Sequence, residues 1–225
     1  MASTVFASPA SKQVLAAIEG VDSSKGVLVT VMNYTGDVLN FGVAVEKAKA
    51  RNPKKQIETL VVGDDVGVPR SRAGKVCRRG IAGTVFVHKI TGEMAAAGFG
   101  LNEVKRVGIL VSRSIVSIDV SLDRVHVPGQ PIGDVSDRIP GAGEVELGMG
   151  VHNEPGSGRW SGQAAELPAL AEEMLHQMID VDDKERGFLE TKADKMVLLV
   201  DNIGVLSASE LGAIVTEVAD QLRKT

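Results

Sequence analysis

The sequence is short of cysteine and of aromatic residues, and both shortages limit what the chain can be. A single cysteine, Cys77, excludes an internal disulfide framework and any metal site built from several thiolates, and it fits a reducing compartment. Aromatic residues make up 3% of the 225 residues, so aliphatic side chains, alanine and methionine must fill the core. The hydrophobic share of 44% is ordinary for a globular protein of this length.

Long apolar runs and a strong excess of one charge are also missing. No stretch approaches the ~18 uninterrupted apolar residues of a membrane span, and the first residues lack the basic region and apolar core of a secretory signal. The net charge is −4, from 25 basic and 29 acidic residues, which disfavours nonspecific binding to nucleic acid or anionic membranes. We therefore expect a cytoplasmic protein with no nucleic-acid partner and no membrane partner.

Several common catalytic signatures do not occur. The sequence contains no GxxxxGK[ST] phosphate loop, no GxGxxG after a strand, no GxSxG, no HExxH and no CxxC. The familiar signatures of nucleotide-binding, serine-hydrolase and zinc proteins are thereby missing, and the chemistry has to be sought in other residues.

The clearest local pattern is a strand, a turn and a helix over residues 26–42. The apolar run from Val27 to Met32 predicts a buried strand, and a polar turn at 33–37 precedes a periodic helical segment. Asp37 is expected to cap this helix and to face the crevice at the carboxyl ends of the strands, where open α/β sheets bind ligands. From the pattern alone, a cap without further function and a functional carboxylate both remain open.

The rest of the chain alternates between helical and strand patterns, which predicts an α/β fold. Ser8 is expected to cap a first helix that begins at Pro9 and buries Val14, Leu15 and Ile18. Further strands are expected at 57–62, 116–122, 144–150 and 196–202, and further helices at 81–97, 101–112, 167–179 and after the capping box at 207–210. Residues 128–143 are expected to form a long irregular connection, and 180–187 a solvated charged stretch.

Two further segments carry candidate chemistry. The basic loop at 69–80 is either a phosphate contact or a solvated loop whose arginines pair with nearby groups, and charge alone favours the second. His152 lies in the string GMGVHNEPGSG, where glycines allow another group to approach the backbone and Glu154 is an acidic neighbour. Such a histidine is a candidate general base, nucleophile or metal ligand, the last together with Glu154, Asp64 and Asp65.

Four long strings of this sequence resemble one known family. They are VMNYTGDVLNFGVAVEKAKA, VVGDDVGVPRSRAGKVCRRGIAGTVFVHKITG, LDRVHVPG and EVELGMGVHNEPG, and in this order they are similar to the substrate-binding K domain of dihydroxyacetone (glycerone) kinases of the ATP-dependent eukaryotic type. The resemblance implies a partial K-domain fold, with mixed sheets flanked by helices in two subdomains. Residues 1–160 would form the substrate-site subdomain, and 161–225 would begin the second.

The resemblance also implies a mechanism. His152 would bond covalently to the carbonyl of dihydroxyacetone or glyceraldehyde as a hemiaminal, and Asp37 would be the general base for the hydroxyl that attacks the γ-phosphate. Ser8 would lie close to the substrate. ATP and Mg²⁺ would be bound by a helical L domain that this chain lacks, so no residue here is assigned to a cofactor or a metal. The K domains of the family are typically homodimers.

The sequence departs from the family in two places. A glycine-rich GGGSGHEP motif, expected upstream of the segment that begins here, is missing, and Met32 stands where many relatives have a lysine. We therefore expect a kinase substrate-binding domain that is not active alone and needs an L-type domain in trans. The alternatives are a non-catalytic protein that binds dihydroxyacetone and regulates, and an inactive truncated product.

Overall fold

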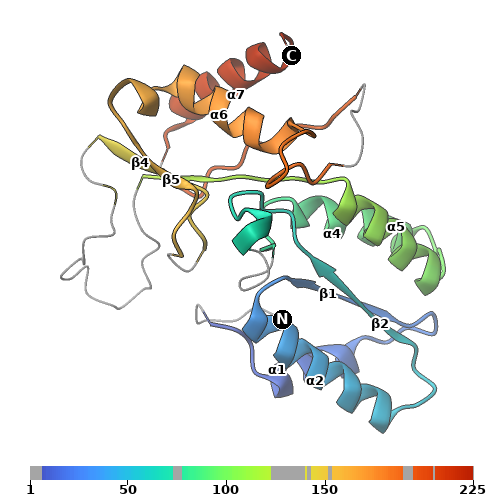
Figure 1. The fold of residues 1–225 in the computed structure, drawn as a ribbon. Helices are drawn as coiled ribbons and strands as arrows, with labels where there is room; N and C mark the ends of the chain where they lie inside the picture. The colour runs from blue at the N-terminus through green and yellow to red at the C-terminus, as the bar shows by residue number, and fades with distance from the viewer. Residues whose placement is uncertain are drawn as a thin grey trace. The chain divides into compact units, whose positions relative to one another are not determined.

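The computed structural model describes residues 7–72, 78–122, 140, 143–151, 154–189, 195–204 and 206–224. Contacts between residues divide the chain into two units, residues 1–64 with 77–115 and residues 65–76 with 116–225. Each unit combines helices with a small sheet (Figure 1). The expected division into 1–160 and 161–225 concerns which part carries the substrate site, and it stays a prediction. Within the described ranges, no helix has the length and apolar character that a membrane crossing requires.

The first unit is built on two parallel strands. Its elements are α1 (Ser11–Gly20), β1 (Val27–Met32), α2 (Thr35–Arg51), β2 (Ile57–Val62), α4 (Thr84–Ala96) and α5 (Leu101–Arg113). β1 and β2 pair in register from Val27 opposite Ile57 to Met32 opposite Val62. Both strands were expected at these bounds, and the sequence prediction is confirmed for them.

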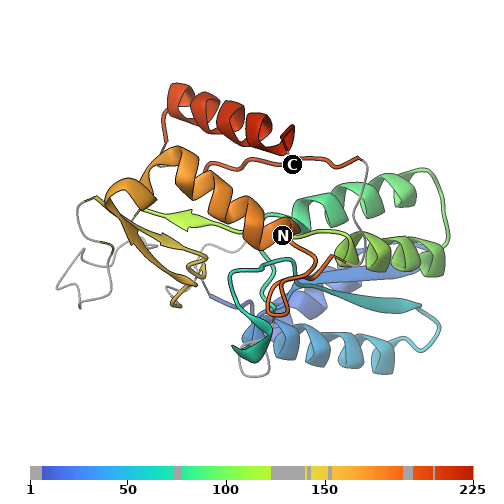
Figure 2. The same ribbon diagram turned by 45° about the horizontal axis from the view of Figure 1, so that its top comes forward.

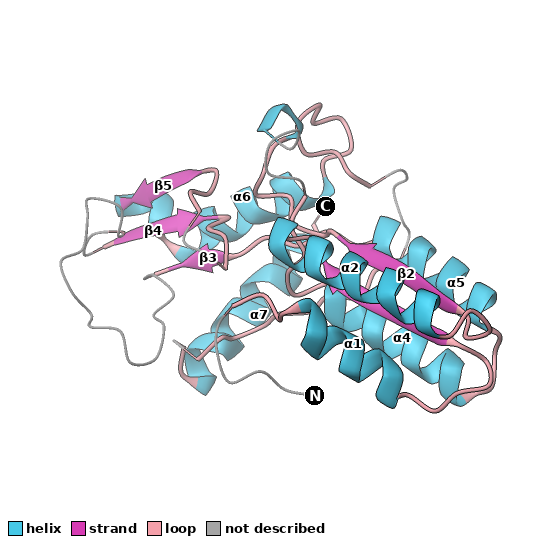
Figure 3. Ribbon diagram, turned by 90° about the horizontal axis from the view of Figure 1, so that it is seen from below, coloured by secondary structure: helices cyan, strands magenta, loops and turns pink. Residues whose placement is uncertain are grey.

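Helices cover both faces of this small sheet, α1 and α2 on one side and α4 and α5 on the other (Figure 3). Because side chains alternate along a strand, Val27 and Val29 point to the first face and Leu28 to the second. The first core also contains Val14, Leu15 and Ile18 of α1, the three residues predicted for its buried side. Leu60 and Val62 of β2 pack in the second core.

The predicted start of the first helix is wrong by two residues. α1 begins at Ser11, and its N-cap is Ala10, not Ser8. The amide of Ala10 donates to Oε1 of Gln13 at 2.8 Å, and the amide of Gln13 donates to the Ala10 carbonyl at 2.8 Å. The glutamine side chain thus satisfies the amide at the start of the helix, and Ser8 is left outside it.

The second unit contains an antiparallel sheet and two long helices. Its elements are β3 (Val120–Ser121), β4 (Glu144–Leu147), β5 (Gly158–Ser161), the 3₁₀ turn η1 (Gly162–Ala165), α6 (Leu167–Ile179) and α7 (Ala208–Leu222). The strand order is β3-β4-β5. The predicted strand at 116–122 is shorter than expected, and β5 was not predicted. α6 has the predicted bounds, and most of the connection at 128–143 lies outside the described residues.

The predicted strand at 196–202 is wrong. Residues 195–203 form no regular element, and no strand in the described part of the chain pairs with them (Figure 2). Met196 and Val197 are 57% and 79% exposed, so the apolar run is not buried. An apolar run becomes a strand only where a neighbouring strand and a covering layer accept it. The capping box that follows is confirmed, since Ser207 Oγ accepts the amide of Glu210 and starts α7.

Candidate functional site

The carboxyl ends of β1 and β2 are joined to the loop at 78–83. The amide of Asn33, just after β1, donates to the carbonyl of Val62 at 2.9 Å. Its side-chain Nδ2 donates to the carbonyl of Arg78 at 2.8 Å. Gly80 packs so close that an added Cβ would lie 2.9 Å from Cβ of Met32. Hydrogen bonds and close packing therefore hold the end of β1, where the sequence predicts substrate chemistry, against a neighbouring loop.

Asp64 fastens the same loop from the end of β2. Its side chain is fully buried, and its two carboxylate oxygens accept the amides of Ile81 and Gly83, each at 2.8 Å. The amide of Asp64 in turn donates to the carbonyl of Arg79 at 2.9 Å. A buried carboxylate needs such donors, and these come from the turn that leads into α4. Asp64 therefore holds the start of α4 against β2.

Asp37 lies in the first turn of α2, but it is not the helix cap. The N-cap is Tyr34, α2 begins at Thr35, and Asp37 is the third helical residue. The expectation that Asp37 caps the helix is therefore wrong, because the ladder from β1 ends at Asn33 and the helix starts at once. The half-buried carboxylate still interacts favourably with the positive end of the helix dipole, because it lies in the first turn.

Ser8 lies beside the same helical turn. A Cβ added to Gly36 would lie 2.7 Å from Oγ of Ser8, so the serine hydroxyl stands against the residue that precedes Asp37. Two of the three predicted site residues thus belong to the first unit and are neighbours there. Ser8 remains exposed to solvent.

His152, the third predicted site residue, lies outside the described residues. The flanking residues 143–151 and 154–161 are described and belong to the second unit. Gly148, with a φ of +72°, packs against Gly67, and a Cβ on Gly67 would lie 2.7 Å from Cα of Gly148. The amide of Gly150 donates to the carbonyl of Glu154 at 3.0 Å. The glycines around His152 thus serve the close packing of this segment.

In the described part of the basic loop at 69–80, the arginines contact other groups of the protein. The guanidinium of Arg70 lies 4.2 Å from the centre of the Phe188 ring and donates to the carbonyl of Gly187 at 2.8 Å. Arg78 donates to the carbonyls of Asp64 and Ile115. Of the two readings of this loop, these contacts favour arginines that pair with nearby groups.

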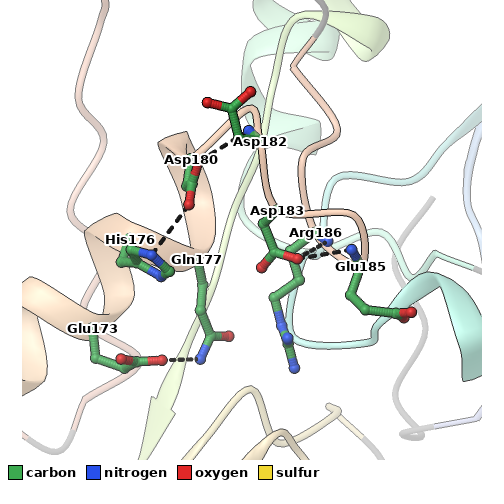
Figure 4. A network of polar contacts seen from close by, with 8 residues as sticks. All are labelled: Glu173, His176, Gln177, Asp180, Asp182, Asp183, Glu185 and Arg186. Carbon is green, nitrogen blue, oxygen red and sulfur yellow. Dashed lines mark hydrogen bonds and ion pairs between the residues drawn. The ribbon is translucent and has the colours of Figure 1, made fainter.

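The charged stretch at 180–187 is folded onto itself and is not simply solvated (Figure 4). Asp183 Oδ1 accepts the amides of Glu185 and Arg186, and Nε2 of His176 lies 3.2 Å from Oδ2 of Asp180. The carboxylate of Glu185 accepts the amide of Ser71 at 2.9 Å. Hydrogen bonds from the amide and the hydroxyl of Ser71 hold the pKa of Glu185 below its usual value.

The described residues do not fit a nucleotide-bound metal. Two of the three carboxylates suggested as ligands accept backbone amides: Asp64 accepts those of Ile81 and Gly83, and Asp65 accepts that of Gly67 at 2.7 Å. Across the described ranges, no three acidic, histidine or cysteine residues gather as a metal would require. No step of the chemistry is therefore assigned to a metal on this chain.

Sequence reasoning missed the residues that fasten these segments. Asp64 was noticed only as half of an acidic pair, and Asn33 only as part of a polar turn. Their hydrogen-bond partners lie 14 to 45 positions away in the sequence. The one available signal was their place directly after two predicted strands, where a polar side chain can reach a neighbouring loop.

Comparison with known proteins gives one consistent family. The model of the Dak1 domain matches residues 1–225. Dihydroxyacetone kinase 2 of Saccharomyces cerevisiae is 42% identical over 226 residues, which cover 98% of this chain and 36% of that protein. The chain therefore spans little more than a third of the length of this curated relative.

Solved structures agree with this match. The dihydroxyacetone kinase of Citrobacter freundii in its native form superposes with a TM-score of 0.79 at 36% identity, covering 96% of this chain and 36% of that one. The same kinase has also been solved in complex with AMP-PNP and Mg²⁺. The dihydroxyacetone kinase operon co-activator Dha-DhaQ superposes with a TM-score of 0.77 at 28% identity, covering 96% of this chain and 62% of that one.

Proposed function

The chain belongs to the Dak1 domain family, and we propose on that basis that it is the substrate-binding part of a dihydroxyacetone kinase. The observation that carries the proposal is the family match over residues 1–225, together with the site motifs NYTGD and GMGVH within it. The substrate is dihydroxyacetone or glyceraldehyde, and the reaction is phosphoryl transfer to its hydroxyl group. The working protein is a cytoplasmic homodimer.

His152 captures the substrate. A nitrogen of its imidazole adds to the carbonyl carbon, the C=O π bond becomes a C–OH, and the proton displaced from the ring is balanced by the one gained at oxygen. The product is a hemiaminal that retains every atom of the ligand. This step selects ketones and aldehydes over glycerol, which has no carbonyl. The assignment rests on the GMGVH motif that contains His152.

Asp37 removes the proton from the substrate hydroxyl that attacks phosphorus. Its carboxylate lies at the start of α2, and Ser8 stands beside the preceding residue, where its hydroxyl would contact the same ligand. Phosphoryl transfer needs a positioned, deprotonated nucleophile more than it needs covalent chemistry at phosphorus. Met32 at the end of β1 offers no hydrogen bond in place of a lysine, which would weaken this part of the pocket.

The nucleotide is assigned to a separate L-type domain. The Citrobacter freundii kinase has been solved with AMP-PNP and Mg²⁺, whereas the described residues of this chain offer no matching donor set. We assign ATP and Mg²⁺ to an L-type domain supplied in trans, and this chain alone is not expected to turn over.

A second candidate function is regulation. The co-activator Dha-DhaQ has nearly the same fold similarity, and this chain covers 62% of it, compared with 36% of the kinase. In this alternative, His152 captures dihydroxyacetone as a signal and no phosphate is transferred.

Intact-mass analysis after incubation with dihydroxyacetone tests both proposals. The chain should gain the mass of one whole dihydroxyacetone, His152→Ala should gain nothing, and Asp37→Asn should keep the adduct. No adduct on the unmutated chain would reject both functions. An ATP-coupled assay with an added L-type domain then separates them, since only a kinase makes phosphorylated product and only the kinase loses it in Asp37→Asn.

A further inference from the structure

The hydrophobic core of the first unit holds only the second half of α2. The buried residues of this helix all belong to that half and are Ala44, Val45 and Ala48. In the first half, Leu39 is 64% exposed and Val43 is 47% exposed. Phe41 is the first residue of the helix to pack against the core, and it is only partly buried. The first turn of α2, which carries Asp37, must therefore be held by other contacts.

The turn that joins β1 to α2 supplies such contacts through Asn33. Its amide donates to the carbonyl of Val62 at 2.9 Å, and its side-chain Nδ2 donates to the carbonyl of Arg78 at 2.8 Å. This half-buried residue is thus bonded to two other segments of the first unit. Only Tyr34 separates it from the first residue of the helix, so a displacement of Asn33 also displaces the start of α2.

The carbonyl that accepts the Asn33 side chain is itself fixed. The guanidinium of Arg78 donates to the carbonyl of Asp64 at 2.9 Å and to that of Ile115 at 2.8 Å. A Cβ added to Gly63 would collide with the carbonyl oxygen of Arg78, so the backbones of these two residues are in direct contact. Asn33 therefore donates to an acceptor whose place is set by the chain around β2.

The start of α2 has no side-chain cap that could take over this role. The residues at its first two positions, Thr35 and Gly36, are exposed. The amide of Val38 donates to the carbonyl of Tyr34 at 2.9 Å, which closes the first turn but bonds it to no other segment. The side chain of Asn33 is therefore the polar contact that ties this end of the helix to the loop at 78–83.

We propose that Asn33 is a positioning residue for Asp37: its side-chain hydrogen bond to the Arg78 carbonyl sets where the first turn of α2 lies, and with it the Asp37 carboxylate. The inference rests on the proposed function, in which Asp37 takes a proton from the substrate hydroxyl. Asn33 acts on Asp37 through the backbone of residues 34–37.

Two variants of Asn33 and one matched control test this role. Asn33→Ala removes the donor, and Asn33→Asp keeps the shape of the side chain but replaces the donor with a carboxylate oxygen. Lys55 is the control, because its Nζ also donates to backbone carbonyls of the first unit, those of Ile18 at 2.9 Å and Val21 at 2.7 Å. It lies just before β2, at the opposite end of the strands from Asn33. Lys55→Ala thus removes a similar contact far from Asp37.

Hydrogen exchange of the chain alone measures the hold on the first turn. Both Asn33 variants should speed exchange of the Val38 amide by about fivefold or more, the scale of one lost hydrogen bond. The amide of Asn52, which bonds to Ala48 at the other end of α2, should exchange as before. Lys55→Ala should leave the Val38 amide unchanged.

Binding of dihydroxyacetone then tests the position of Asp37. In the unmutated chain, the ligand should shift the amide resonances of residues 35–38. In Asn33→Ala, intact-mass analysis should still find the adduct on His152, but these shifts should shrink. In the coupled assay with an L-type domain, turnover should fall by about tenfold or more, because a small misplacement of a catalytic group is costly. Lys55→Ala should keep both the shifts and the turnover.

The outcomes separate this inference from the proposed function. If dihydroxyacetone shifts no amide at 35–38 of the unmutated chain, the proposed role of Asp37 fails, and the role of Asn33 fails with it. If those shifts occur but persist in both Asn33 variants, or if Val38 exchange is unchanged there, only the role of Asn33 is overturned. An equal loss in Lys55→Ala also overturns it. So does a first unit that no longer melts cooperatively in both Asn33 variants, since Asn33 would then hold the fold and not the turn.

Discussion

Two stretches of this chain have the same sequence design and different structures. Residues 27–51 and 196–222 both begin with an apolar run that ends in asparagine and both continue into an amphipathic helix. In the first stretch, the run is β1, paired with β2 and covered by helices on both faces. In the second, the run has no strand partner in the described part of the chain, and α7 has no buried residue.

The difference shows that a hydrophobic pattern specifies a surface to be buried but not the element that buries it. Val27 and Val29 are buried because α1 and α2 lie over their face of the sheet. Val197 and Leu199 are just as apolar and remain 79% and 41% exposed. The following experiments test this contrast, from the largest expected effect to the smallest.

A matched pair of leucine truncations should separate the two stretches most clearly. Leu60 is 5% exposed in the core over β2, and Leu60→Ala should cost about 2–5 kcal/mol. Leu199 is 41% exposed, and Leu199→Ala should cost less than about 1 kcal/mol. Urea unfolding followed by circular dichroism measures both. Equal losses would show that the 195–204 run carries as much burial as β2, and the contrast would fail.

A second pair compares side chains that each accept two backbone amides. Asp64 accepts those of Ile81 and Gly83 and is fully buried, so Asp64→Ala should cost about 3 kcal/mol. Oδ1 of Asn202, a half-buried residue, accepts the amides of Gly204 and Leu206. Asn202→Ala should cost about 1 kcal/mol or less, because water replaces the lost bonds. A similar shift of the unfolding midpoint in the two variants would contradict the difference in burial.

Removal of a helix cap should act only locally in the second stretch. Ser207→Ala deletes the acceptor for the Glu210 amide, and the loss of such a cap costs about 1 kcal/mol of helix stability. Because α7 buries no residue, we expect faster hydrogen exchange in its first turn and an unchanged midpoint for the first unit. A lower midpoint in the first unit would mean that α7 is coupled to that core.

The smallest expected effect is a pH dependence of the contact between Glu185 and Ser71. This contact belongs to the second unit but lies outside the 196–222 stretch, and it tests whether that part of the unit is held by specific hydrogen bonds. The pKa of Glu185 is lowered by hydrogen bonds from the amide and the hydroxyl of Ser71. A carboxylate whose pKa is lower in the folded state contributes stability above its unfolded pKa of about 4.3, and loses it as the pH falls through the folded value. The amide resonance of Ser71, followed by NMR, should therefore shift below pH about 4.3. Ser71→Ala removes the hydroxyl and keeps the amide, so the pKa of Glu185 should move part of the way back toward its usual value; an unchanged pKa would contradict the contribution of the hydroxyl.

The sequence predicted those helices and strands well whose buried residues follow an uninterrupted apolar periodicity. The buried side of α1 and the bounds of β1, β2 and α6 follow from periodicity and need no knowledge of distant partners. The cap of α2 was predicted wrongly, because the start of that helix depends on a ladder bond between Asn33 and Val62. A local pattern carries no information about such a bond.

The candidate site shows the same limit. The family motifs give Asp37, Ser8 and His152, and the structure places Asp37 in the first turn of α2 and Ser8 against the residue before it. The structural roles of the buried carboxylates of Asp64 and Glu146 were not predicted, because each accepts hydrogen bonds from backbone amides that only folding brings near. Motifs identify residues that react, whereas residues that hold them in place are identified from contacts.

The most direct test of the account is carbon NMR with dihydroxyacetone labelled at its carbonyl carbon. With the unmutated chain in excess, the trigonal carbonyl signal should give way to a tetrahedral one, because His152 adds to that carbon. With His152→Ala, the carbonyl signal should stay as it is for free ligand. A carbonyl that remains trigonal in the presence of the unmutated chain, or a tetrahedral signal that persists in His152→Ala, would contradict the central claim.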